Sequence, residues 1–132
     1  MEGREREVLY YQSVSGEQPF KEWRDRISDD DLRAIIYARV GRLRGSNFGD
    51  SKSVGGGVSE NRIHLGSGYR IYYGVDGNNV VLLCAGEKST QDADIITAKD
   101  YWSDYKKRKR DREKGGLKNV GPPKRSSKRP KK

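Results

Sequence analysis

Residues 58–85 contain three segments with the side-chain pattern of β-strands, separated by two short turns. In residues 58–65 apolar and polar side chains alternate, and the same alternation returns in residues 69–75. Residues 80–85 are almost entirely apolar, which is typical of a central strand that is covered on both faces. The linking segments, residues 66–68 and 76–79, contain glycine and favour tight hairpins. This pattern therefore predicts a sheet at the centre of the fold.

The flanking segments predict one more strand and three helices. Residues 8–11 are rich in β-favouring side chains. Residues 19–27 begin with a proline, which suits the first position of a helix, and continue with apolar side chains at i, i+3 and i+7. Three aspartates at 29–31 supply a cap and acidic charge for a second helix that ends near Arg44. Residues 89–102 predict the last helix.

The resulting element order is β-α-α-β-β-β-α, and the fold class is α+β. The sheet is expected to be small and mostly antiparallel. We expect the helices to pack on one face of the sheet and the other face to remain partly open. Large aromatic side chains with core spacing are interpreted as packing residues: Phe20, Trp23 and Trp102.

The positive charge of the chain is concentrated at its C-terminal end. Residues 103–132 hold 14 of the 28 Lys and Arg but only 3 of the 19 Asp and Glu. We therefore divide the chain into a folded domain, residues 1–105, and a basic tail, residues 106–132, which is expected to be disordered. The first part of the tail can also extend the last helix as a charged surface. Because the charge is so uneven, the net value of +9 does not by itself assign nucleic-acid binding to the folded domain.

Alternation also brings cationic side chains of neighbouring strands to a common face. Arg62 and His64 share one face of their strand. Arg70 and Tyr72 share one face of the next strand, so the two pairs meet if the short turn joins the strands. Lys88 follows the third strand and can close one edge of the cluster. Fixed cations on a sheet suit a phosphodiester, and they can stabilise the charge that builds up when RNA is cleaved by its own 2′-hydroxyl.

Each of these side chains has a structural interpretation as well. Arginines on an exposed sheet face are often only solvated. The single histidine, His64, either moves protons in the reaction or is incidental. Tyr72 either stacks on a base or packs within the sheet. Lys52 and Gln91 are candidates for RNA contacts.

Five blocks of sequence occur in order between residues 47 and 91: NFGD, a glycine-rich turn, SENRI, GYRIYY and GEKSTQ. In this order and spacing they resemble the phage-associated addiction-module killer proteins, a branch of the RelE/HigB group of toxin–antitoxin ribonucleases. The resemblance extends over residues 5 to 102. It implies a RelE-like fold with the element order given above and an open sheet face.

The resemblance also implies roles for individual residues. In RelE-type toxins the arginine of the GYR-type strand and the basic residue after the last strand are catalytic, and these positions match Arg70 and Lys88. Arg62 is the nearest match to a basic residue that the group uses on the preceding strand. Other members commonly carry an acid where this chain has His64, so this position departs from the family pattern. His64 or Tyr72 would assist by proton transfer or base stacking.

A protein of this family would be the toxin of a type II toxin–antitoxin module. The resemblance implies an endoribonuclease that uses no metal or other cofactor and cleaves mRNA in the ribosomal A site. Its partner would be a small helix-turn-helix antitoxin that covers the cationic face or displaces the last helix. Two alternatives stay open: a toxin on the same scaffold that inhibits DNA gyrase, and a degenerate remnant that binds its partner or nucleic acid without catalysis.

The sequence argues against several other classes. One histidine and one cysteine cannot build a Cys/His zinc site, and no nucleotide-phosphate loop is present. Cys84 lies in an apolar run and is expected to be a small buried side chain in a reducing compartment. The N-terminus has no apolar signal segment, and the longest apolar run is six residues, too short to span a membrane. We therefore expect a cytoplasmic protein with no membrane partner.

Overall fold

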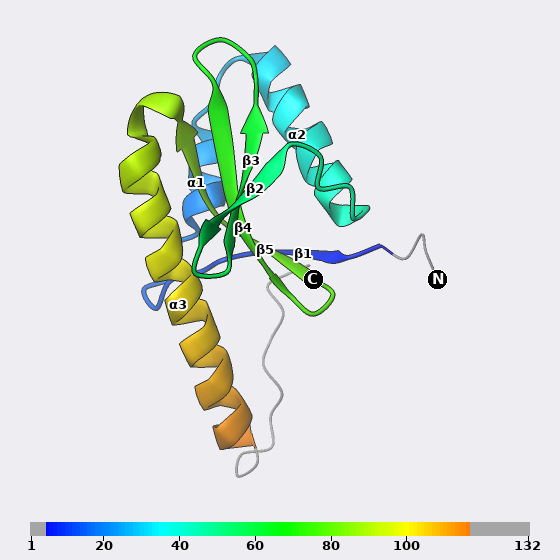
Figure 1. The fold of residues 1–132 in the computed structure, drawn as a ribbon. Coiled ribbons are helices and arrows are strands. Elements are labelled where there is room, and N and C mark those ends of the chain that lie inside the picture. Colours follow the sequence, from blue (N-terminus) through cyan, green and yellow to red (C-terminus); the bar gives the residue numbers. More distant parts are fainter. Residues whose placement is uncertain (1–4, 117–132) are drawn as a thin grey trace.

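The computed structural model describes residues 5–116, which form a five-stranded sheet with three α-helices (Figure 1). The elements follow in the order β1 (Glu7–Tyr10), α1 (Pro19–Asp25), α2 (Asp30–Arg44), β2 (Ser51–Gly55), β3 (Val58–Ile63), β4 (Tyr69–Asp76), β5 (Asn79–Glu87), the 3-10 turn η1 (Lys88–Thr90) and α3 (Gln91–Gly116). In space the strands lie in the order β1-β5-β4-β3-β2. Strand β1 runs parallel to β5, and the other neighbours are antiparallel. The expected α+β class and mostly antiparallel sheet are confirmed.

The strand β2 is an element that the sequence did not predict. Its residues, SKSVG, include a single large apolar side chain, so they lack the alternation by which the other strands are recognised. The segment becomes a strand because the turn at residues 55–57 folds it back against β3, where it pairs Ser51 with Asn61 and Lys52 with Glu60. It lies at the edge of the sheet, where a polar strand is tolerated. The observed order is therefore β-α-α-β-β-β-β-α.

The helices cover both faces of the sheet, which corrects the expectation of one open face (Figure 1). Helices α1 and α2 pack on one face through a core that includes Phe20 and Ile36. Helix α3 packs on the other face through Ala98 and Trp102. The physical reason lies in the sheet itself, because both faces of β4 and β5 carry large buried side chains that need a cover.

Strand β5 is buried on both faces, as its apolar sequence predicts. Val80 and Leu82 contact the core beneath α1 and α2, whereas Val81 and Leu83 contact the core beneath α3. A register shift against β4 then places Cys84 on the α3 side as well. Burial raises the pKa of the Cys84 thiol to about 12, so it remains a protonated packing group, as expected from the sequence.

Helix α3 continues without a break across the expected domain boundary after residue 105. Residues 106–116 are helical, which confirms that the first part of the basic tail extends the last helix and corrects its assignment to a disordered segment. Many of their charges pair one turn apart along the helix. Residues 117–132 lie outside the part of the chain that the structure describes. Helix α1, by contrast, ends at Asp25, earlier than its apolar spacing indicates. Within the described residues, no helix combines the length and the apolarity that a membrane crossing needs.

The helix ends follow the capping signals in the sequence. Pro19 stands at the first turn of α1, and Gly45 ends α2. The Asp29 carboxylate accepts hydrogen bonds from the backbone N–H groups of Asp31 (2.9 Å) and Leu32 (3.2 Å) at the start of α2. These are two of the donors that a helix leaves without a partner at its first turn.

Replacing Asp29 with alanine should therefore lower the free energy of unfolding by about 1 kcal/mol, because the two backbone donors lose their acceptor. Asp30→Ala is the matched control, since it removes an acid from the same first turn without removing the cap. Its cost should be about 0.3–1 kcal/mol, from the helix dipole alone. Urea unfolding curves of the two variants measure the difference, and an equal loss in both would contradict the cap.

Candidate functional site

A cleft of about 480 Å³ lies at the end of the sheet where β3 turns into β4. Residues 62–70 and Lys88 line it, so that its walls come from the ends of two strands, their connecting turn and the start of η1. The four residues predicted to be catalytic, Arg62, His64, Arg70 and Lys88, all belong to this lining. The sheet thus brings together cations that lie up to 26 positions apart in the chain.

Arg62 and Arg70 lie directly opposite each other on β3 and β4. Like charges at directly opposed positions of an antiparallel pair repel and destabilise the sheet. The two side chains are also partly withdrawn from water, with exposed fractions of 29% for Arg62 and 11% for Arg70. Such an arrangement needs a nearby negative charge.

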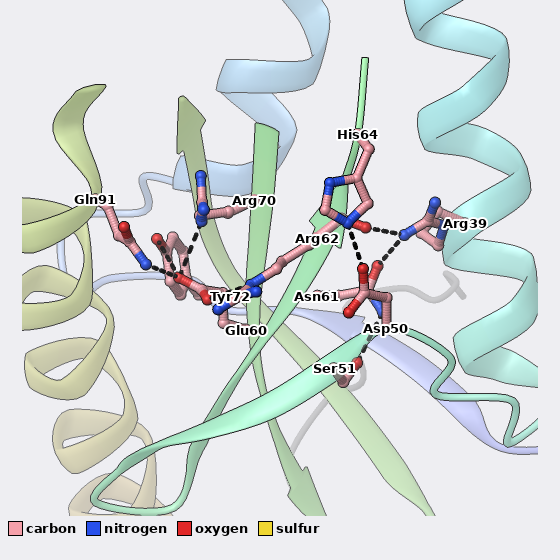
Figure 2. A network of polar contacts seen from close by, with 10 residues as sticks. All are labelled: Arg39, Asp50, Ser51, Glu60, Asn61, Arg62, His64, Arg70, Tyr72 and Gln91. Atoms are coloured by element: carbon pink, nitrogen blue, oxygen red, sulfur yellow. Dashed lines mark hydrogen bonds and ion pairs between the residues drawn. The ribbon is translucent and has the colours of Figure 1, made fainter. Parts of the chain in front are cut away.

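Glu60 supplies this charge from below the cleft (Figure 2). Its carboxylate is fully buried and lies 3.2 Å from Nε of Arg62 and 3.3 Å from Nε of Arg70. The Arg62 contact is a hydrogen bond, whereas Nε of Arg70 lies within ion-pair distance without the alignment of a hydrogen bond. Tyr72 and Gln91 also donate to the same carboxylate, at 3.2 Å and 2.7 Å. One carboxylate thereby holds two guanidinium groups, and a net positive charge remains for a ligand.

Lys88 closes the cleft from the side of η1. Its backbone N–H donates to the carbonyl of Gly68 (3.1 Å), which ties the end of β5 to the turn between β3 and β4. Gly68 adopts a left-handed φ of 90°. A side chain at this position would contact both Lys88 and the guanidinium of Arg70. The left-handed backbone, rather than a lack of space, therefore favours glycine at this turn between the two cations.

His64 lies outside the Glu60 cluster and pairs with a different acid (Figure 2). Its Nε2 is 2.5 Å from a carboxylate oxygen of Asp50, and its side chain is 73% exposed. The hydrogen bond from His64 holds the pKa of Asp50 below its usual range. Because one ring nitrogen faces Asp50, the other remains available to a ligand in the cleft.

The strand that carries Arg62 is also tied to helix α2. Nη1 of Arg39 donates to the side-chain oxygen of Asn61 (2.8 Å) and to the backbone carbonyl of Arg62. The amide of Asn61, which is fully buried, donates to the carbonyl of Phe48 and to the hydroxyl of Ser51 (2.8 Å). This network, drawn in Figure 2, fixes the backbone at the mouth of the cleft.

The remaining predicted site residues occupy other positions. Tyr72 is fully buried beneath α3 and donates to Glu60, so it cannot stack on a base; burial raises its pKa and keeps the hydroxyl protonated. The stacking role is wrong because α3 covers the face that was expected to be open. The side-chain amide of Gln91 is engaged with Glu60. Lys52 is exposed on β2 and lines a separate groove next to Phe48.

Sequence reasoning missed three residues that organise this site: Glu60, Arg39 and Asp50. Strand alternation places Glu60 on the same face as Arg62 and His64, but its role as the acid between two arginines was not predicted. Nothing in the sequence indicates that Arg39 would reach from α2 to β3. Asp50 lies in a loop whose path depends on the unpredicted strand β2. Among the described residues, no group of three or more His, Cys, Asp or Glu side chains is arranged to hold a metal ion.

Comparison with known proteins adds one relative. The chain is 48% identical over 81 residues to an uncharacterized protein of Haemophilus influenzae, and the match spans 61% of this chain and 82% of that protein. The chain belongs to the same family as this Haemophilus protein. No described family model matches the sequence. At this degree of identity over most of the Haemophilus protein, the two chains share one fold.

Proposed function

We propose that this protein is the toxin of a type II toxin–antitoxin module and acts as a metal-independent endoribonuclease on mRNA, with a RelE-like fold. The single observation that supports the proposal is the lining of one cleft by Arg62, His64, Arg70 and Lys88. These side chains come from β3, the turn after it, β4 and η1, and they line a space large enough for a nucleotide. The sequence blocks that resemble the addiction-module killer proteins supply the reaction class.

The proposed reaction begins with attack of a ribose 2′-hydroxyl on the adjacent phosphorus. The 2′-oxygen–phosphorus bond forms, the bond from phosphorus to the 5′-oxygen breaks, and the products are a 2′,3′-cyclic phosphate and a free 5′-hydroxyl. Negative charge accumulates on the non-bridging oxygens of the pentavalent transition state. Arg62, Arg70 and Lys88 stabilise this charge from fixed positions, which is the largest catalytic contribution that such a site offers.

Two protons must move in this reaction, one from the 2′-hydroxyl and one to the departing 5′-oxygen. His64 supplies the imidazole of the cleft lining, and histidine is the side chain that most often transfers protons in catalysis. Asp50 holds one ring nitrogen, so the imidazole has a defined orientation, and its other nitrogen accepts or delivers a proton. We assign one of the two proton transfers to His64 on this basis.

The charge balance of the cleft supports an anionic ligand. Glu60, beneath the cleft, balances one of the two guanidinium groups, and among the described residues no acid belongs to the lining itself. Two nearby acids contact lining residues, Asp50 at His64 and Glu87 at Ser67. Lys88 adds a further positive charge. A small neutral metabolite would leave these cations without a partner, whereas a phosphodiester would satisfy them bidentately.

Arg70→Ala should reduce RNA cleavage by roughly 10²–10³-fold, the effect of removing one well-placed charge-stabilising donor. The assay follows cleavage of mRNA by the purified protein, with ribosomes and in the presence of EDTA, and maps new 5′ ends by primer extension. Arg44→Ala is the matched control, since it removes an exposed arginine at the far end of α2, away from the cleft. Its rate should equal that of the wild type.

The same variants separate the proposal from its alternatives in cells. Induced expression of the wild type should arrest growth and produce new mRNA ends that disappear in Arg70→Ala. Growth arrest with intact mRNA and broken DNA would overturn the proposal in favour of a gyrase inhibitor. Expression without any arrest would overturn it in favour of a non-catalytic binding protein. A neighbouring gene for a small helix-turn-helix protein would supply the expected antitoxin.

A further inference from the structure

The C-terminal half of α3 extends past the sheet (Figure 1), and its residues 104–116 hold seven Lys and Arg against three Asp and Glu. Around most of this segment, charges of opposite sign alternate one turn apart. The ammonium group of Lys107 lies 3.0 Å from Asp111, and a guanidinium nitrogen of Arg108 lies 2.9 Å from Asp104. Such i, i+4 pairs stabilise a solvated helix.

One side of this helix segment breaks the alternation. Lys106, Arg110 and Lys114 recur every four residues, so they form a stripe along the helix, which we call the basic stripe. All three are exposed, and among the described residues none of them forms an ion pair with an acid. Like charges at i, i+4 destabilise a helix, so a stripe of three cations costs folding energy that alternating signs would avoid.

A groove of about 300 Å³ runs beside the basic stripe. Val75 and the stacked rings of Trp102 and Tyr105, whose centroids are 5.2 Å apart, form its apolar bottom. Lys106 and Arg110 stand on its rim, and the Lys106 ammonium lies over the Trp102 ring at 5.8 Å. Asp76 and Glu113 also line the groove, but both form ion pairs with Lys109. Because Trp102 is buried, the groove offers a ligand the charges of Lys106 and Arg110 rather than an open ring.

Helix α3 connects this groove to the cleft. Gln91, the first residue of α3, donates to Glu60 beneath the cleft, and the helix then runs unbroken to the basic stripe. The rise of an α-helix places Arg110 about 28 Å along the axis from Gln91. Helix α3 thus holds the stripe at a fixed distance from Gln91, whose side chain contacts Glu60 beneath the cleft.

We propose that the basic stripe binds the phosphodiester backbone of the same RNA whose scissile linkage occupies the cleft. The inference rests on the proposed function for the identity of the RNA, and on the geometry of α3 for the second contact. A long polyanion fits better than an acidic protein segment, because the cationic run continues in the sequence. Residues 117–132 add seven Lys and Arg and no acid. Contacts of this kind add affinity that is independent of base sequence and depends strongly on salt.

The test measures binding of the full chain to a single-stranded RNA whose 2′-hydroxyls are methylated, so that binding is observed without cleavage. The stripe variant is Lys106→Gln with Arg110→Gln. The control variant is Lys107→Gln with Arg112→Gln, which removes the same charge from other sides of the same helix. For each protein the binding constant is determined between 0.1 and 1 M salt.

The stripe variant should reduce the magnitude of the slope of log K against log salt by about 1.4, or about 0.7 for each lost phosphate contact. That change corresponds to roughly 25-fold weaker binding at 0.1 M salt relative to 1 M salt. The control variant should keep the slope of the wild type. Equal slopes in all three proteins, or equal losses in the two variants, would overturn the proposal.

Cleavage assays on an unmethylated dinucleotide keep the two proposals apart, because so short a substrate cannot reach the stripe. The stripe variant should cleave it at the wild-type rate, and Arg70→Ala should not. If the wild type cleaves no RNA but the stripe variant still has the smaller slope of log K against log salt, the proposed function is wrong and RNA binding by the stripe is supported. If the wild type cleaves RNA and the stripe variant binds RNA with the wild-type slope, RNA binding by the stripe is contradicted and the proposed function is supported.

Discussion

Replacing Glu60 with alanine should lower the free energy of unfolding by about 3–5 kcal/mol, the range observed when one partner of a buried ion pair is removed. Glu60 is fully buried, accepts hydrogen bonds from Arg62, Tyr72 and Gln91, and lies within ion-pair distance of Arg70. Without it, Arg62 and Arg70 face each other across β3 and β4 with no acid between them. The hydroxyl of Tyr72 also loses its acceptor inside the core.

The lower end of this range is the expected result, because Arg62 is 29% exposed and water can screen part of its charge. Glu60→Gln should cost less than Glu60→Ala, since the amide oxygen keeps one acceptor and fills the same volume. Glu113→Ala is the matched control; its carboxylate is 66% exposed, and its removal should change stability by less than about 0.5 kcal/mol. Urea unfolding followed by tryptophan fluorescence measures all three.

A result in which Glu60→Ala is as stable as the wild type would contradict the network in Figure 2. It would mean that the two arginines do not converge in the folded protein, and the cleft would lose the feature on which its proposed chemistry depends. The stability of Glu60→Ala therefore tests the site without any knowledge of its ligand.

The sequence predicts the cationic residues of the cleft because two local rules suffice. Alternation along a strand fixes the face of each side chain, and the short turn at residues 66–68 fixes which strands are neighbours. These rules place the cations on one face but do not fix the register: a turn of residues 66–68 would put His64 opposite Arg70, whereas β3 ends at Ile63 and Arg62 lies opposite Arg70. The central position of residues 80–85 was predictable in the same way, since their apolar side chains fill both faces.

The packing of α3 on the second face of the sheet was not predicted, although the sequence partly indicates that this face is buried. Residues that alternate onto that face include Tyr72 and Val81, which are large and apolar and need burial. The helical stripe of α3 could satisfy either face, because periodicity shows that a helix has an apolar side but not what it packs against. The role of Tyr72 changed as a consequence, from a base-stacking candidate to a buried donor.

The partners that lie far apart in sequence could not be predicted at all. Asp50 meets His64 because the edge strand β2 returns the chain to that point, and a polar edge strand leaves little pattern. Arg39 meets the backbone of Arg62 through the packing angle of α2 on the sheet. Such contacts depend on tertiary geometry, whereas the cleft cations depend on local strand rules.

Trp102 should prove to be the packing residue on which the position of α3 most depends. Its ring lies against Gly74 of β4, where an added Cβ would come within 2.6 Å of two ring carbons. Trp102→Ala should lower the free energy of unfolding by about 3–5 kcal/mol through lost burial and the cavity that remains. Gly74→Ala should cost about 1–3 kcal/mol, because the new methyl group forces the ring out of its place.

The two substitutions should not be additive. In the Trp102→Ala background the space above Gly74 is empty, so Gly74→Ala should cost little or fill part of the cavity. Gly41→Ala is the matched control: no side-chain or backbone atom lies within 4 Å of its added Cβ, and it should stabilise α2 by about 0.5–1 kcal/mol in both backgrounds. Urea unfolding followed by circular dichroism measures the cycle. An equal cost of Gly74→Ala with and without Trp102 would show that strand geometry, and not the contact with α3, requires glycine there.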